Sequence, residues 1–248
     1  MAGHDVSENQ NSLRKQPADQ ENRSQAALEI LDLPPLEATF FDRCPVQVAQ
    51  DIVGRWLWRS LGNVGVAGRI VEAEAYLADG DAASHAAKGP NQKNAAMFGP
   101  PGHAYVYTIH SRQCFNVVTQ GAGTGSAVLI RAIEPVFNVP QMQAWRQAAA
   151  LRRKPAEQSK SPEAFPEFSL RDIARGPARL CEAMHIGRDC NLLPLSPESG
   201  LWLTSAGDDL PVQVGISARI GVTQAKEMPL RFFAKDSPFV SGPRWLNQ

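Results

Sequence analysis

The stretch Arg69-Ile-Val-Glu-Ala-Glu-Ala-Tyr76 predicts a β-strand with two different faces. Side chains alternate along an extended strand, so Glu72, Glu74 and Tyr76 share one side and the small apolar residues between them share the other. Carboxylates beside an aromatic ring indicate a site that receives a flat, electron-poor group and helps water to attack it. The alternative is the solvated face of an amphipathic strand, with Tyr76 capping its end.

The composition is that of a globular protein without a membrane segment. The chain has 248 residues, of which 43% are hydrophobic, enough for a substantial core. No apolar run reaches the roughly 18 residues that span a bilayer, and the N-terminus lacks a signal-peptide core. The four cysteines are irregularly spaced, which predicts neither a zinc site nor a disulfide framework.

The charges are balanced overall but unevenly distributed. Residues 1–37 carry seven acidic and three basic side chains, so the rest of the chain has four more bases than acids. Residues 1–30 are polar and predict a disordered leader before a folded domain over residues 31–248. A mildly basic domain is compatible with a nucleic-acid partner but does not establish one.

Hydrophobic periodicity and turn residues predict the remaining elements. A long connection over residues 78–103, rich in Gly, Pro, Ala and Asn, is typical of a functional loop. We expect a hairpin from residues 105–109 and 115–119, with a polar tip at 110–113. We also expect helices over 45–58, 141–154 and 170–184, the last interrupted at Gly176-Pro177, an exposed loop over 155–168, and strands over 64–74, 127–133, 212–222 and 230–233.

Several dispersed runs of the sequence, from about residue 36 to 244, resemble one known family. They are Arg69–Tyr76, Ala83-Ser-His85, Met97-Phe98, Pro101-Gly102, Tyr105-Val-Tyr107, Asn116, Val128–Pro135, Gly176–Met184, Arg219-Ile-Gly-Val222, Pro229–Phe233 and Ser237–Ser241. Their order and spacing are similar to those of the alkyladenine (3-methyladenine) DNA glycosylases of the β-hairpin type. The resemblance implies a single α+β domain with a curved, largely antiparallel sheet, flanking helices and a protruding β-hairpin.

The resemblance assigns the chemistry to two side chains. Glu74 matches the family's general base, which deprotonates the water that replaces the departing purine. Arg131 matches an arginine near that water, although a strand-end salt bridge would be its ordinary role. Glu72 could be a second acid, but a solvated or structural side chain is the more common case. No metal or other cofactor is implied.

The remaining matches are to the base pocket and to the DNA-distorting hairpin. Tyr76, His85 and Tyr107 match aromatic walls that would stack on a cationic base, Asn116 matches a residue that excludes guanine, and Met97 matches a DNA contact. The family usually has an intercalating tyrosine where this chain has His110. The wedge is therefore either His110 or, after realignment, Arg112 or Gln113.

Three functions follow as hypotheses. The first is a monofunctional glycosylase that removes alkylated or deaminated purines from duplex DNA by base flipping, in the first step of base excision repair. The second is a non-catalytic module that binds damaged duplex, and the third is a hydrolase of free nucleosides. For the first we expect a monomer, no membrane partner, and a cytoplasmic location, associated with the nucleoid if the source is bacterial.

Overall fold

An eight-stranded antiparallel sheet forms the centre of the part of the chain that the computed structural model describes, residues 32–153, 167–206 and 212–247. The predicted leader and most of the 155–168 loop lie outside these ranges. The strands are β1 (Trp56–Leu61), β2 (Val64–Tyr76), β3 (Ala104–Ile109), β4 (Arg112–Thr119), β5 (Ser126–Phe137), β6 (Leu201–Thr204), β7 (Val214–Ser217) and β8 (Arg231–Ala234). The α-helices are α2 (Ala38–Phe41), α3 (Pro45–Asp51), α4 (Val139–Arg152) and α5 (Pro177–Ala183). The fold is a single α+β domain, as predicted.

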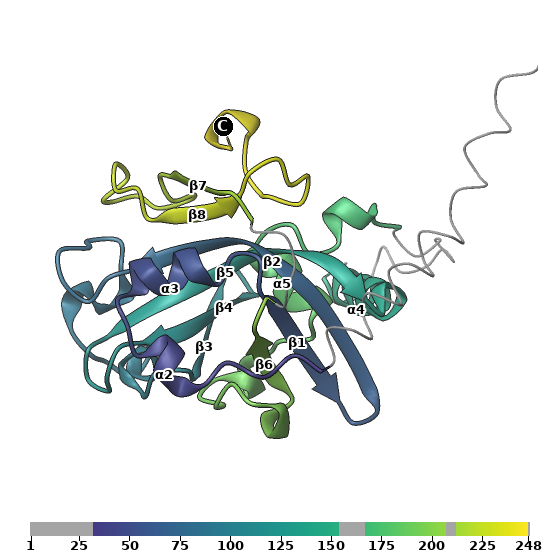
Figure 1. Ribbon diagram of the computed structural model, residues 1–248, viewed down its shortest axis with the longest axis horizontal. Coiled ribbons are helices and arrows are strands. Elements are labelled where there is room, and N and C mark those ends of the chain that lie inside the picture. Colours follow the sequence, from purple (N-terminus) through teal and green to yellow (C-terminus); the bar gives the residue numbers. More distant parts are fainter. Residues whose placement is uncertain (1–31, 154–166, 207–211, 248) are drawn as a thin grey trace, which may run out of the picture.

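Strand β2 organises the sheet because it has three partners. Strand β5 runs along one of its edges, while β1 pairs with its first half and β8 with its second half on the other edge. The continuous order is β3-β4-β5-β2-β1-β6, and β7 pairs with β8. In Figure 1 the β7–β8 pair lies with the C-terminus above the rest of the sheet. The C-terminal segment is thereby brought to the part of β2 that carries Glu72 and Glu74.

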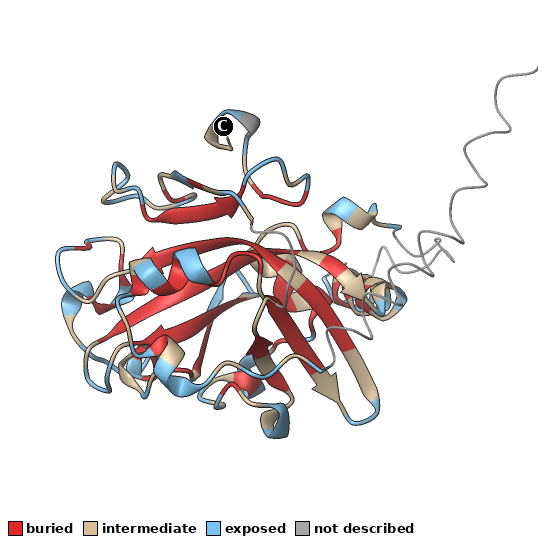
Figure 2. Cartoon of the chain, in the orientation of Figure 1, coloured by how far each residue is buried: buried red, intermediate tan, exposed pale blue. Residues whose placement is uncertain are grey.

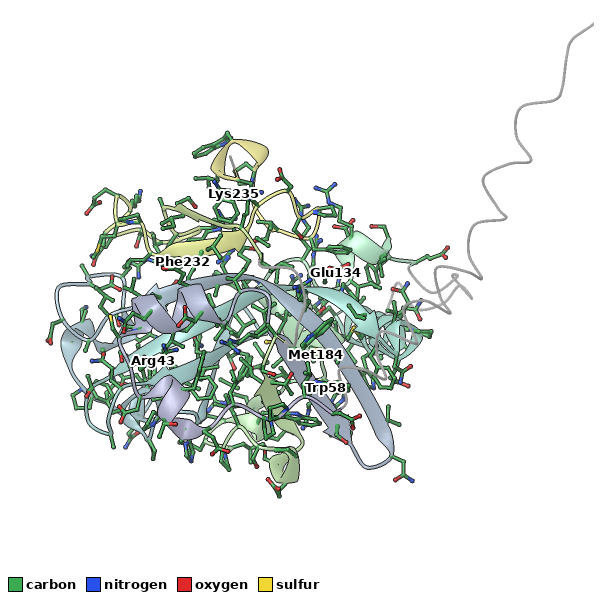
Figure 3. The ribbon with its side chains drawn as sticks, in the orientation of Figure 1. Arg43, Trp58, Glu134, Met184, Phe232 and Lys235 are labelled. Atoms are coloured by element: carbon green, nitrogen blue, oxygen red, sulfur yellow. The ribbon has the colours of Figure 1, made fainter. Side chains whose placement is uncertain are left out.

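The alternation along each strand separates the two larger of three buried clusters in the described residues; the third contains Trp56, Trp58 and Ala67. The larger contains Ala75, Val106, Val117 and Val128, together with side chains of α3 and α5. Phe232 of β8 and Met184, which follows α5, belong to it and are labelled in Figure 3. The smaller cluster takes the neighbouring residues, such as Tyr105, Val118 and Ala127. Figure 2 shows that most of the central sheet is buried, so both faces are covered.

Short 3-10 helices and loops cover the face with the smaller cluster. The connection between β2 and β3 contains η1 (His85–Lys88) and η2 (Ala95–Phe98), and both contribute side chains to that cluster. Further 3-10 turns are η4 (Leu170–Asp172), η5 (Arg188–Cys190), η6 (Pro197–Ser199) and η7 (Arg244–Leu246). The long loop predicted for 78–103 is thus a covering layer.

The first predicted helix was drawn too long. Helix α3 ends at Asp51, and Gly54 has φ 93°, a left-handed conformation that suits glycine and turns the chain into β1. Trp56, Leu57 and Trp58 are therefore strand residues, although Val53 and Leu57 have helical spacing. The interruption before α5 was correct, since Gly176 has φ 113° and Pro177 is the first helical residue.

The hairpin is tighter than predicted. Ile109 of β3 pairs with Arg112 of β4, so Arg112 and Gln113 are strand residues rather than tip residues. Only His110 and Ser111 form the loop, with φ 46° and 61°. Two positive φ values are those of a type I′ turn, whose twist matches that of the paired strands. Within the described ranges no helix has the length and apolar character needed to cross a membrane.

Candidate active site

Glu74 lies near the end of β2, and its side chain is fully buried. One carboxylate oxygen, Oε1, accepts a hydrogen bond of 2.7 Å from the Ile220 backbone N–H. The other, Oε2, accepts one of 3.0 Å from the Tyr76 hydroxyl. Both donors fix the plane of the carboxylate, and Oε2 keeps a lone pair that can accept a hydrogen bond from water. Glu74 does not point into bulk solvent.

Arg131 of β5 joins the two carboxylates of β2. Its Nη1 lies 3.3 Å from Glu74 Oε1, and its Nε lies 3.1 Å from Glu72 Oε1. The β2–β5 register shifts on both sides of Glu72, and irregularities of this kind re-aim side chains near sites. Burial alone would lower the pKa of Arg131, but Glu74 and Glu72 raise it above its ordinary value. Arg131 therefore remains a cation.

Glu72 is not solvated, contrary to the amphipathic-strand interpretation. It is fully buried, and besides Arg131 it binds the Nε of Arg231 at 2.6 Å and the backbone N–H of Ser241 at 2.8 Å. Burial opposes ionisation, but Arg131 and Arg231 outweigh it and hold the pKa of Glu72 below its ordinary value. A permanently ionised, fully hydrogen-bonded carboxylate cannot act as the second acid.

An aromatic cavity lies beside the Tyr76 end of this cluster. It is lined by Tyr76, His85, Met97, Tyr105, Tyr107 and Asn116, and its volume is about 20 Å³. That space holds about one water molecule, not a purine. The His85 and Tyr107 rings meet edge to face, with centroids 4.6 Å apart. A flat ring can enter only if the walls of the cavity move apart.

His85 is the wall that belongs to the covering loop. Its Nδ1 lies 2.7 Å from the Tyr105 hydroxyl, and its backbone carbonyl accepts a hydrogen bond of 2.8 Å from the Asn94 side chain. Burial lowers the pKa of His85, which favours the neutral imidazole. A neutral ring does not repel a cationic base, so the wall suits an alkylated purine.

An arginine packs against one face of the Tyr76 ring. The Arg219 guanidinium lies 4.6 Å from the centre of the Tyr76 ring and forms two hydrogen bonds of 2.6 Å with Asp81. Burial and the neighbouring Glu74 raise the pKa of the Tyr76 hydroxyl far above its ordinary value, so it stays protonated and can only donate to Glu74. One face of the ring is thereby occupied, which leaves the other for the cavity.

Two other predicted residues are in the cavity wall. Asn116 is buried, and its Nδ2 donates a hydrogen bond of 3.0 Å to the Tyr105 carbonyl across the hairpin, which fixes its amide. Met97 is only 2% exposed and packs in the smaller cluster, so it could meet DNA only from inside the cavity. The structure therefore brings all six residues predicted for the chemistry and the base pocket to one place.

The residues proposed for the wedge are separated from the cavity. His110 is exposed at the turn, and Gln113 bonds to Thr108 at 3.0 Å across the hairpin. By alternation, Ile109 and Arg112 lie on the same face as Tyr107, whereas Gln113 lies on the opposite face. Ile109 is a large apolar side chain that is 48% exposed next to the turn, and no role was predicted for it from the sequence.

Other supporting residues were also missed. Arg219, Ile220, Arg231 and Ser241 stood within the runs that carried the resemblance, but no role was given to them. Asn94 had no local signal, because its function is to bind two carbonyls in its own loop. Among the described residues, no group of three or more His, Cys, Asp or Glu side chains could hold a metal ion.

A buried, oriented carboxylate that is paired with an arginine beside an aromatic cavity is suited to hydrolysing a glycosidic bond. The chain belongs to the methylpurine-DNA glycosylase family, whose model matches residues 39–238. A relative from Rhodopirellula baltica, named "Putative 3-methyladenine DNA glycosylase", is 41% identical over 84% of this chain and 83% of its own. A relative of the same name from Koribacter versatilis is 40% identical over 88% of this chain and 98% of its own.

Proposed function

We propose that this protein is a monofunctional glycosylase that hydrolyses the N-glycosidic bond of alkylated or deaminated purines in duplex DNA, the first step of base excision repair. The observation that carries the proposal is the buried Glu74 carboxylate, held by Ile220, Tyr76 and Arg131 at the edge of the aromatic cavity. A damaged purine in a duplex cannot reach this cavity unless its nucleotide rotates out of the helix.

In the proposed reaction Glu74 is the general base. As the C–N bond breaks, the sugar gains oxocarbenium character, which the carboxylate stabilises while it accepts a proton from the attacking water. A purine made cationic by alkylation at N3 or N7 departs as a neutral base, whereas a neutral lesion such as hypoxanthine or ethenoadenine must gain a proton from water as it leaves. Among the described residues that touch Glu74 there is no lysine, so no Schiff base with the sugar is expected.

Selectivity is proposed to come from the cavity walls. Stacking of the base on Tyr76, His85 and Tyr107 contributes on the order of 1–3 kcal/mol per contact, and a cationic base gains the electrostatic part as well. The fixed Asn116 amide would collide with the exocyclic amine of guanine. Entry of the base requires the walls of the cavity to move apart, and His85 lies in the loop that covers the sheet rather than in a strand.

We assign the wedge to Ile109, with His110 beside it at the turn. Proteins that unstack DNA commonly insert an apolar side chain, and Ile109 is exposed on the hairpin face that carries the cavity. His110 is polar, and its left-handed backbone places it in the turn itself. Gln113 is a poor candidate because its side chain bonds to Thr108.

The experiment that tests this function uses duplexes with one lesion each, for example 3-methyladenine, 7-methylguanine, hypoxanthine or ethenoadenine. Abasic sites formed by the protein are cleaved with alkali and the fragments are separated. Strand cleavage that requires both protein and lesion is expected. Salt-dependent binding without base release would instead identify a binding module, and release from free nucleosides alone would identify a nucleosidase. The proposal includes a monomer that acts in the cytoplasm, on the nucleoid if the source is bacterial.

A further inference from the structure

A second layer of buried charge lies behind the catalytic pair. Arg231 of β8 is fully buried, and its Nε donates a hydrogen bond of 2.6 Å to Glu72 Oε1. Glu72 in turn accepts from Arg131 Nε at 3.1 Å, and Arg131 lies 3.3 Å from Glu74. The four side chains therefore form a continuous row of alternating charge, Arg231–Glu72–Arg131–Glu74, in which Glu74 is the one that bonds to a residue lining the cavity, Tyr76.

The C-terminal segment completes this row. Ser241 donates its backbone N–H to Glu72 Oε2 at 2.8 Å, and its hydroxyl lies 3.4 Å from Arg131 Nη2. The remaining donors of Arg231 bind Ser217 at 2.8 Å, the carbonyls of Leu246 and Ser241 at 3.1 Å, and Asn247 at 2.7 Å. Arg231 thus holds the end of the chain around Glu72, and every end of its guanidinium is occupied.

The geometry points to Glu72 and Arg231 as positioning residues: we propose that they fix the orientation of Arg131 and the share of its charge that reaches Glu74. This inference rests on the proposed function, in which Glu74 is the base. Arg131 is shared between two carboxylates, so its attraction to Glu74 depends on how far Arg231 and Ser241 satisfy Glu72. A row of this kind adjusts the base from a distance without touching the substrate.

The two ends of the row have opposite effects on the net charge. Without the Glu72 charge, Arg131 belongs to Glu74 alone and the ionised form of Glu74 is favoured. Without the Arg231 charge, Glu72 draws more on Arg131, and an unbalanced anion near Glu74 disfavours its ionisation. Removal of both charges makes the buried row neutral again, but Arg131 loses the ion pair with Glu72 that orients it.

Other charged or titratable groups face Glu74 or its partners, and they are the same in all the variants below. They are Tyr76 of β2, Tyr107 of β3, Cys114 of β4, Asp81 in the loop after β2, Arg175 before α5, and Arg219 before Ile220. Any difference between the variants therefore comes from the row itself.

The test is the pH dependence of single-turnover base release by Glu72→Gln, Arg231→Met and the double variant, with KM measured for the lesion duplex. In a plot of the rate of base release against pH, the acid limb is the low-pH side on which the rate falls. We expect this limb to move by about one pH unit in opposite directions, down for Glu72→Gln and up for Arg231→Met. In the double variant the limb should return to the wild-type position, while kcat falls by about tenfold to a hundredfold at unchanged KM because Arg131 is misplaced. An acid limb that stays at the wild-type position in both single variants, or that moves in the same direction in both, would overturn the proposal.

Arg146→Met is the matched control. Arg146 of α4 is also a buried arginine, paired with Glu182 of α5, and lies outside the row. It should lose stability without any change in the acid limb or in kcat. If the single variants do not fold, the double variant decides, since it buries no unpaired charge: a kcat equal to that of Arg146→Met would contradict a positioning role.

Failure of this inference can be told from failure of the proposed function. Glu74→Gln is run in the same assay. If Glu74 is not the base, that variant keeps its activity. If Glu74 is the base but Glu72 and Arg231 do not act on it, Glu74→Gln is inactive while the acid limbs of the Glu72 and Arg231 variants coincide with that of the wild type.

Discussion

The carboxylate site on β2 and the tip of the β3–β4 hairpin differ in almost every physical respect. At the site, Glu72 and Glu74 are fully buried, and each of their oxygens has a donor. At the tip, His110 and Ser111 are exposed, and Ile109 is 48% exposed. The proposed chemistry therefore depends on buried side chains that are hydrogen-bonded to several elements, whereas the proposed distortion of DNA depends on side chains exposed to solvent.

Because of this difference, substitutions at the site and at the tip should change different kinetic quantities. A change at the site should reduce the rate of the chemical step and leave the binding of damaged duplex nearly intact, because the groups act on the sugar in the transition state. A change at the tip should weaken the extruded state, and so reduce the rate mainly at low protein concentration. Substitutions that break this separation would show that the two regions are coupled.

Among substitutions that keep the charges in place, the largest loss is expected for Arg131→Lys. One ammonium group cannot contact Glu72 and Glu74 with the fork geometry of a guanidinium, so Glu74 loses its fixed partner. Single-turnover base release should fall by about 10²-fold, comparable to the loss of one oriented donor. An Arg131→Lys rate equal to the wild-type rate would remove the arginine from the catalytic role.

Ile109→Ala should have the next largest effect. Burial of an isoleucine side chain against unstacked bases is worth about 1.5–3 kcal/mol, so its loss should lower the affinity for a lesion duplex roughly tenfold or more. The measurement is the dependence of base release on protein concentration: the half-saturating concentration should rise while the limiting rate stays near that of the wild type. His110→Ala serves as the control, and an equal loss there would move the wedge to His110.

Tyr76→Phe should have a smaller effect. The ring that forms the wall remains, but Glu74 Oε2 loses the 3.0 Å hydrogen bond from the hydroxyl. Hydrogen bonds to charged groups contribute about 1.5–3 kcal/mol, part of which water can replace, so we expect a several-fold loss in the limiting rate. Tyr107→Phe keeps the opposite wall and makes no bond to Glu74, so it is the matched control in this assay. Equal losses for both would mean that the Glu74 contact has no special role.

The smallest effect is expected for His110→Tyr. A tyrosine at the turn adds stacking area, but the left-handed backbone of residue 110 disfavours a bulky side chain. A gain of at most a few-fold in lesion affinity should follow. A gain of a hundredfold would show that the histidine is an impaired wedge and that Ile109 is secondary.

The sequence predicted which side chains of the proposed site lie together better than it predicted the hairpin tip, because local alternation determines which residues share a strand face. Glu74 and Tyr76 are two residues apart, so they must meet wherever the strand forms. The Glu72–Arg231 bond joins residues 159 positions apart and depends on how β8 pairs with β2, which no local pattern determines. The same reason explains why Asp81 and Arg219, which are 138 positions apart, received no role.

The errors in the fold have equally local causes. The Trp56-Leu57-Trp58 run was added to a helix because Val53 and Leu57 have helical spacing, while the decisive feature was the left-handed Gly54. Strand β6, Leu201–Thr204, was missed because four residues are too short for a period to appear. At the hairpin, the two-residue turn shifted Arg112 and Gln113 into β4, and with that shift Ile109 became the exposed apolar residue.

The most direct test of the account is single-turnover base release by Glu74→Gln, measured beside binding of the same lesion duplex. The amide keeps the shape of the side chain but cannot accept a proton from water. We expect the variant to bind the lesion duplex with wild-type affinity and to release the base at a limiting rate lower by about 10²- to 10⁴-fold, the usual contribution of a general base. A folded Glu74→Gln protein that releases the damaged purine at the wild-type rate would contradict the account.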